Sequence, residues 1–143
     1  MPVVERSALV LFSAAKMYRL VEDVDSYPLF LSWCIDSSVL AQDEYSQDAS
    51  LTIALAGIRK KFQTRNLLIA GESISLDLVN GPFTRLSGGW SFVHLSAEGC
   101  RISLRLEFEF SHSLLSVAFE RGFARVIDRL VNDFVHRAED LYE

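Results

Sequence analysis

The sequence has few of the residues that build disulfide frameworks, metal sites or membrane-spanning helices. It contains two cysteines, Cys34 and Cys100, whose spacing matches no metal motif, and the chain does not begin with a signal-like leader. No run approaches the ~18 consecutive apolar residues of a transmembrane helix. These features predict reduced thiols in a cytoplasmic protein, and they limit any contact with the inner membrane to the bilayer surface.

Positive charge is also scarce. The chain has 14 Lys and Arg against 19 Asp and Glu, which gives a formal net charge of -5. Because phosphate contacts supply most of the affinity for DNA, and DNA-binding proteins are usually basic, DNA is not an expected partner. Four basic residues nevertheless gather in one short stretch, where they form either an ordinary solvated strand edge or a local surface for an anionic partner. They are Arg59, Lys60, Lys61 and Arg65.

Catalytic and metal-binding patterns are absent from the sequence. The histidines, His94, His112 and His136, are dispersed and form no cluster with cysteine or carboxylate at metal-ligand spacing. Neither cysteine lies in a reactive-thiol motif. The pair Gly88-Gly89 lacks the helix start and Lys-Ser/Thr of a phosphate loop, and adjacent glycines within a strand instead predict a β-bulge or bend. We therefore expect no catalytic residues, no metal ion and no required cofactor.

The sequence is rich in apolar residues. Hydrophobic residues make up 50% of the chain, and ten residues are Phe. Along 101–110 polar and apolar residues alternate strictly, which is typical of a strand with one buried and one wet face. From residue 119 the apolar period changes to three or four, which predicts a long amphipathic helix. Its apolar positions are Phe119, Phe123, Val126, Ile127, Leu130, Phe134, Ala138 and Leu141.

The order of elements predicts an α+β fold in a single domain, residues 1–143. A first strand at 3–12 is followed by a helix capped by Ser13 and then by a second short helical turn or loop, since Asp25, Ser26 and Pro28 interrupt the first helix. The long helix is the last element. Before it, turn residues separate six further strands, at 35–42, 49–56, 60–70, 73–79, 83–96 and 101–111.

A single long helix has to cover a large twisted sheet, and such an arrangement can enclose a cavity. Aromatic residues from the segment after the first helix, from the strands and from the last helix are available to line it. Ligand pockets are mainly apolar and aromatic, but the same side chains also suit a filled core, so the sequence leaves both interpretations open. The candidate ligand-binding residues are Tyr27, Phe30, Trp33, Phe62, Trp90, Phe92, Phe108, Phe123, Leu130 and Phe134.

A set of segments forms a pattern that extends over nearly the whole chain. The segments are Asp25-Ser26-Tyr27-Pro28-Leu29-Phe30-Leu31-Ser32-Trp33-Cys34, Phe62-Gln63-Thr64-Arg65-Asn66, Gly81-Pro82-Phe83, Gly89-Trp90-Ser91-Phe92, the strand at 100–110 and the end of the last helix at 134–138. In this order and at this spacing they resemble the coenzyme Q-binding START-domain family, which is also labelled polyketide cyclase/dehydrase.

The resemblance implies a helix-grip (START-like) fold. In this fold a curved antiparallel sheet of about seven strands surrounds the long C-terminal helix, and two short helices follow the first strand. The resemblance also implies a tunnel between sheet and helix that binds a hydrophobic isoprenoid lipid, above all ubiquinone, as a carrier or chaperone that supports respiration. The loop at 27–33 would then close one end of the tunnel.

Bacterial members of the same family imply an alternative. They include ribosome association toxins, of the toxin–antitoxin type, which bind the large ribosomal subunit and prevent the subunits from joining. Under this alternative the four clustered basic residues would contact ribosomal RNA. Neither alternative is an enzymatic function. The family label does not imply a cyclase reaction, because a fold does not by itself determine a function, and we find no residues that would support such a reaction.

Overall fold

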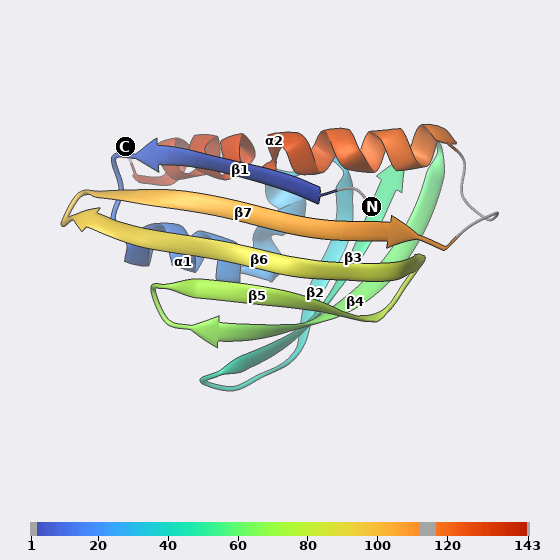
Figure 1. Cartoon of the computed structure of the whole chain (residues 1–143), viewed down its shortest axis with the longest axis horizontal. Coiled ribbons are helices and arrows are strands. Elements are labelled where there is room, and N and C mark those ends of the chain that lie inside the picture. The colour runs from blue at the N-terminus through green and yellow to red at the C-terminus, as the bar shows by residue number, and fades with distance from the viewer. Residues whose placement is uncertain (1–2, 112–116, 143) are drawn as a thin grey trace.

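The computed structural model describes residues 3–111 and 117–142, which form one curved sheet with helices on its inner face (Figure 1). The sheet has seven antiparallel strands in the order β1-β7-β6-β5-β4-β3-β2. The predicted helix-grip architecture is therefore confirmed. The elements are β1 (Val3–Val10), α1 (Ala14–Glu22), the short 3-10 helix η1 (Val24–Leu29), β2 (Cys34–Gln42), β3 (Ser46–Leu55), β4 (Ile58–Ile69), β5 (Ser73–Asn80), β6 (Phe83–Ser96), β7 (Gly99–Phe110) and α2 (Val117–Tyr142).

The alternating segment forms β7, which lies between β1 and β6. Its apolar residues face inward and are buried apart from the half-buried Phe110, whereas Arg101, Arg105 and Glu109 are exposed. Ile102 lies opposite Ala8 of β1 on one side and opposite Phe92 of β6 on the other. The two-residue period of one strand thus fixes the inward face of its neighbours, since a one-residue slip would turn every apolar side chain to solvent.

Side-chain hydrogen bonds cap α1 and tie η1 to the edge strand of the sheet. The Ser13 hydroxyl accepts the Lys16 amide N–H at 3.2 Å, which confirms the predicted N-cap of α1. The Ser37 hydroxyl of β2 donates to the Val24 carbonyl at 2.6 Å, which ties η1 to that strand. The aromatic segment that follows η1 is therefore positioned over the inner face of the sheet.

Helix α2 runs along the length of the sheet and covers its inner face (Figure 1). An ion pair between Arg6 and Asp128 joins the edge strand β1 to the exposed side of this helix. Within residues 3–111 and 117–142, no helix is both long enough and apolar enough to cross a membrane. The buried face of α2 consists of Phe119, Phe123, Val126, Ile127, Leu130, Val131, Phe134 and Ala138.

Several strands begin earlier than their residue patterns indicate, and the difference is largest for β3. Strand β3 starts at Ser46, three residues before the predicted start at 49. The reason is the Asp43 carboxylate, one oxygen of which accepts the amide N–H groups of Tyr45 and Ser46, both at 2.8 Å. This bonding makes a tight turn, so that β2 and β3 can pair from Gln42 and Gln47 onward.

The sequence predicted a bulge or a bend at the glycine pair in β6, and the bulge is the alternative that is wrong. The β6–β7 register runs unbroken through Gly88 and Gly89, and its irregularities lie instead near the two ends of the pairing. Gly88 has φ +142°, and a Cβ atom built there would lie 2.0 Å from the Arg105 carbonyl oxygen. The glycines are needed because the backbones of the neighbouring strands approach closely at this bend of the sheet.

Gly88→Ala is expected to destabilise the protein by about 2 kcal/mol or more, because the added methyl group overlaps backbone and the positive φ disfavours an L side chain. Gly122→Ala in α2 is the matched control. Its Cβ would meet Leu55 at an ordinary 3.5 Å, and alanine favours a helix by about 1 kcal/mol over glycine. Urea denaturation should show opposite changes in the free energy of unfolding. Destabilisation of equal size in the two variants would contradict the close approach at Gly88.

Candidate ligand-binding cavity

A cavity of about 80 Å³ lies between the inner face of the sheet and α2. Every element from α1 onward except β2 contributes to its wall, as does the segment between η1 and β2. Most of the lining is aliphatic or aromatic, and among the described residues that line it none carries a charge. The lining residues are Val21, Val24, Tyr27, Leu31, Trp33, Ala49, Leu51, Phe62, Thr64, Asn66, Ile74, Leu76, Leu86, Trp90, Leu104, Leu106, Phe123, Ile127, Leu130 and Phe134.

The structure brings most of the predicted ligand-binding residues to this cavity. Both tryptophans of the chain are among them. The sequence analysis concentrated on aromatic residues and missed the aliphatic part of the wall, for which the inward positions of β3, β5 and β7 were the available signal. The predicted residues that line the cavity are Tyr27, Trp33, Phe62, Trp90, Phe123, Leu130 and Phe134.

Three predicted residues do not line the cavity. Phe108 is 2% exposed and packs edge-on against Phe123, with ring centroids 5.0 Å apart, so it belongs to the filled part of the core. Phe92 packs edge-on against Tyr18 of α1 at 5.7 Å. Phe30 lies half-buried outside the cavity. Part of the aromatic cluster therefore lines the cavity, and the other part does not.

Phe134 joins the segment around η1 to the last helix. Its ring meets Tyr27 at 5.5 Å, Phe30 at 5.2 Å and Trp90 at 5.1 Å, in each case nearly edge-on. Arg137, one turn further along α2, places its guanidinium 5.0 Å from the centre of the Phe30 ring. These contacts close the cavity wall between η1 and α2 with aromatic side chains from both.

The Tyr27 phenol does not act as a titrating group at neutral pH. Its hydroxyl donates to the Val21 carbonyl at 2.5 Å, and burial raises the pKa of Tyr27 above its ordinary value. The phenol is therefore neutral, and its hydrogen bond links η1 to the end of α1. Tyr27 contributes shape and an apolar ring to the cavity.

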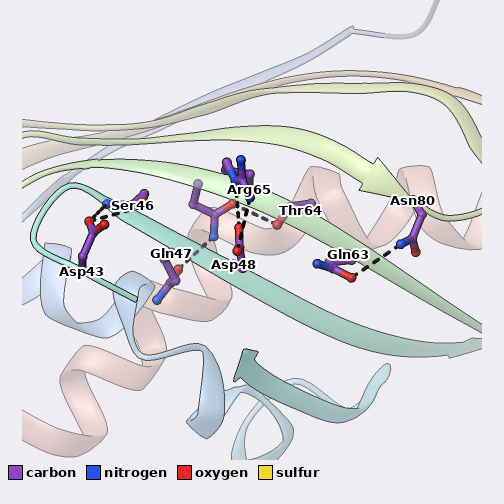
Figure 2. A network of polar contacts seen from close by, with 9 residues as sticks. Asp43, Ser46, Gln47, Asp48, Gln63, Thr64, Arg65 and Asn80 are labelled. Atoms are coloured by element: carbon purple, nitrogen blue, oxygen red, sulfur yellow. Dashed lines mark hydrogen bonds and ion pairs between the residues drawn. The ribbon is translucent and has the colours of Figure 1, made fainter. Parts of the chain in front are cut away.

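The polar residues Thr64 and Asn66 of β4 also line the cavity, and sequence reasoning missed both. They are 4% and 2% exposed. The Thr64 hydroxyl donates to Asn66 Oδ1 at 2.9 Å, and Asn66 Nδ2 donates to Gln47 Oε1 at 2.8 Å. Figure 2 shows Thr64 and Gln47 on neighbouring strands, joined by this line of bonds. The available signal was that Phe62, Thr64 and Asn66 share one face of β4.

Trp33 also carries a buried polar atom. Its indole Nε1 is buried and has no hydrogen-bond partner among the described residues, although its side chain lines the cavity. Buried N–H groups without a partner are rare in folded proteins, because desolvation costs about 1–3 kcal/mol when no hydrogen bond replaces water.

The cysteines are not suited to nucleophilic chemistry. Cys34 and Cys100 are both buried as free thiols, and burial raises the pKa of Cys34 to about 11. The pKa of Cys100 is raised for the same reason. The thiolate is the nucleophilic form, so little of it exists at neutral pH. The described residues contain no group of three or more potential metal ligands, and His112 lies outside the described residues.

The predicted basic cluster is divided by the strand that carries it. Arg59, Lys61 and Arg65 alternate on the exposed outer face of β4, whereas Lys60 is half-buried on the inward-facing side of the strand. Arg65 forms an ion pair with Asp48 at 2.9 Å, and Figure 2 shows these two side chains pointing toward each other. Arg59 and Lys61 are thus the two residues of the cluster best placed to meet an anionic partner.

Comparison with known proteins gives consistent results. The chain is 47% identical to the ribosome association toxin RatA of Vibrio cholerae over 99% of each chain, and 45% identical to that of Escherichia coli over 99% of this chain and 90% of the relative. It is 24% identical to the mitochondrial coenzyme Q-binding protein COQ10 of Dictyostelium discoideum over 89% of this chain and 64% of the relative.

A solved structure shows the same fold at low identity. The Zhui aromatase/cyclase from Streptomyces sp. R1128 superposes with a TM-score of 0.83 at 19% identity, over 96% of this chain and 93% of that one. Residues 10–135 match the family described as polyketide cyclase / dehydrase and lipid transport. With most of its length matched in this way, the chain belongs to the polyketide cyclase / dehydrase and lipid transport family.

Proposed function

We propose that this protein binds an uncharged isoprenoid lipid, ubiquinone above all, in the cavity between the sheet and α2, as a non-catalytic carrier or chaperone. The observation that carries the proposal is the uncharged and largely apolar lining of the cavity. The relative named as a coenzyme Q-binding protein supports it. Cytoplasmic location with contact at the inner-membrane surface would suit such a role.

The size of the cavity determines how such a ligand would enter. An apolar cavity of about 150 Å³ holds one benzene molecule, and the cavity here is about 80 Å³. A prenylated quinone therefore requires the cavity to widen. The wall between η1 and α2 is the place where this is easiest, because ring contacts between side chains, rather than a strand ladder, hold it closed.

Apolar burial supplies sufficient free energy for binding. Each buried CH₂ group stabilises by about 0.8 kcal/mol, so one isoprene unit of about five carbons contributes roughly 4 kcal/mol. Micromolar affinity corresponds to about -8 kcal/mol, and association itself costs at least about 4 kcal/mol. Roughly three buried isoprene units are thus enough, without a charged group to recognise the head of the ligand.

A second candidate function is association with the large ribosomal subunit. It is favoured by the relatives named as ribosome association toxins at 40–47% identity over 97–99% of this chain. On this chain the exposed residues Arg59 and Lys61 are the candidate contacts with ribosomal RNA. The two functions use opposite faces of β4, so one protein can carry both.

The first prediction from the proposed function concerns the lipid. Purified protein extracted with organic solvent should yield a prenylated quinone by mass spectrometry. Added ubiquinone should change the fluorescence of Trp33 and Trp90, because both line the cavity. The absence of any lipid, together with unchanged fluorescence and an unchanged melting temperature, would overturn the proposal.

The second prediction concerns the spare volume. Leu130→Phe places extra atoms in the cavity and should weaken ubiquinone binding about tenfold while changing the free energy of unfolding by less than about 1 kcal/mol. Val126→Phe is the matched control, because Val126 is buried in α2 but does not line the cavity. Overpacking a filled core costs about 1–3 kcal/mol, so this control should lose stability. Equal destabilisation of both variants would mean that the cavity offers no usable space.

The third prediction concerns the ribosome. Overexpression should increase free ribosomal subunits in gradient sedimentation, and the double variant Arg59→Glu/Lys61→Glu should abolish this effect. The binding of this variant to large subunits should also depend less on salt. The slope of log K against log salt should become less steep by about 0.7–0.9 for each phosphate contact removed. Arg121→Glu/Arg125→Glu, an equal charge change on exposed α2 residues, should leave binding intact. A wild-type profile without excess subunits would exclude this function.

A further inference from the structure

The inner face of the sheet is interrupted by polar side chains where β3 pairs with β4. Gln47 and Asn66 lie directly opposite each other and are 1% and 2% exposed. Thr64 lies two residues before Asn66 on the same face and borders the cavity with it. Apolar residues at these positions would fill the core equally well, so the polar set is not explained by packing.

The hydrogen bonds of this network have one fixed direction. Gln47 Nε2 donates to the Glu22 backbone carbonyl at 2.8 Å, and a carbonyl can only accept. The oxygen of Gln47 therefore faces Asn66 and accepts from its amide, which in turn directs the oxygen of Asn66 to Thr64. The same Gln47 nitrogen also donates to Gln42 Oε1 at 3.1 Å.

The direction of these hydrogen bonds determines which donor and acceptor groups face the cavity. The single hydrogen of the Thr64 hydroxyl is used toward Asn66, so toward the cavity Thr64 is an acceptor. Asn66 Nδ2 carries two hydrogens, of which its bond to Gln47 uses one. The pair therefore presents an acceptor next to a donor, at the point where an otherwise apolar wall becomes polar.

The charge of the cavity limits the head group further. A carboxylate or phosphate head would be transferred out of water without a cation, because the described lining residues include no Lys, Arg or His. Burial of an unpaired anion is strongly unfavourable. Fatty acids and phospholipids are thereby disfavoured, and an uncharged head that both donates and accepts a hydrogen bond fits best.

We propose that Thr64 and Asn66 bind the hydroxyl head of an uncharged isoprenoid lipid, whose apolar tail lies against the cavity face of α2. The inference rests on the proposed lipid-binding function and adds a choice of head group to it. A hydroxyl donates to Thr64 and accepts from Asn66, whereas an ether or ketone accepts only. A hydroxylated head, such as that of a reduced quinone, is therefore preferred over its fully alkylated or oxidised counterpart.

The experiment uses three probes with the same prenyl chain: geranylgeraniol, its methyl ether and geranylgeranic acid. Binding is measured by the fluorescence of the two cavity tryptophans and by isothermal titration calorimetry, with ubiquinone as a reference ligand. The alcohol should bind about fivefold more tightly than the ether, the effect of one net hydrogen bond, and more than tenfold more tightly than the ionised acid at pH 8.

Two variants test whether the hydrogen bonds of Thr64 and Asn66 cause the preference for the alcohol over the ether. Thr64→Val keeps the shape of the side chain and removes the acceptor, so the alcohol and the ether should bind it equally. Thr52→Val, on β3, does not alter the cavity lining and should keep the fivefold preference. Urea denaturation of both variants establishes that the fold is retained.

The outcomes separate this inference from the function on which it rests. If all three probes and ubiquinone bind but the alcohol has no advantage, or if Thr64→Val keeps the advantage, the head-group inference is overturned and lipid binding stands. If neither the probes nor ubiquinone bind, both are overturned. A preference for the acid would overturn the exclusion of anionic heads.

Discussion

The structure depends on one constraint: a single long helix has to cover the inner face of a seven-stranded, strongly twisted sheet. The apolar stripe of α2 provides most of the cover, and α1 with η1 covers the rest. Where the three meet, aromatic rings rather than backbone ladders complete the wall, with Phe134 in contact with Tyr27, Phe30 and Trp90. The cavity forms because side chains from so few covering elements do not fill the volume that the curved sheet encloses.

The same constraint divides the inner face of the sheet into a filled part and a part that borders the cavity. The aromatic contacts of Phe108, Phe110 and Phe123 fill the core at one end of α2. At the other end, the wall consists of the segment around η1 and a few rings. Under the proposed lipid-binding function, a ligand larger than the cavity would enter by displacing side chains and a short helix, while the strand pairing of the sheet remains intact.

The two faces of β4 bring the proposed functions together in one element. Its inward residues, Phe62, Thr64 and Asn66, belong to the cavity, and its outward residues, Arg59 and Lys61, are exposed cations. Strand alternation keeps these faces apart, so lipid binding and contact with an anionic surface need not compete. Burial raises the pKa values of Cys34 and Tyr27, so both groups stay protonated at neutral pH.

The sequence by itself determined the order of the elements, the strand boundaries to within a few residues, the N-cap at Ser13 and most of the buried face of α2. These depend on local periods and turn residues, which are visible along the chain. The exceptions on α2 are Leu141, which was predicted to be buried but is exposed, and Val131, which is buried but was not predicted. Only the tertiary structure decided which aromatic residues line the cavity and which fill the core, because that depends on the curvature of the sheet and on where α2 crosses it. The interrupted inner face at Thr64, Asn66 and Gln47, and the pairing of Arg65 with Asp48, likewise depend on strand register, which places residues 17 or more positions apart in direct contact.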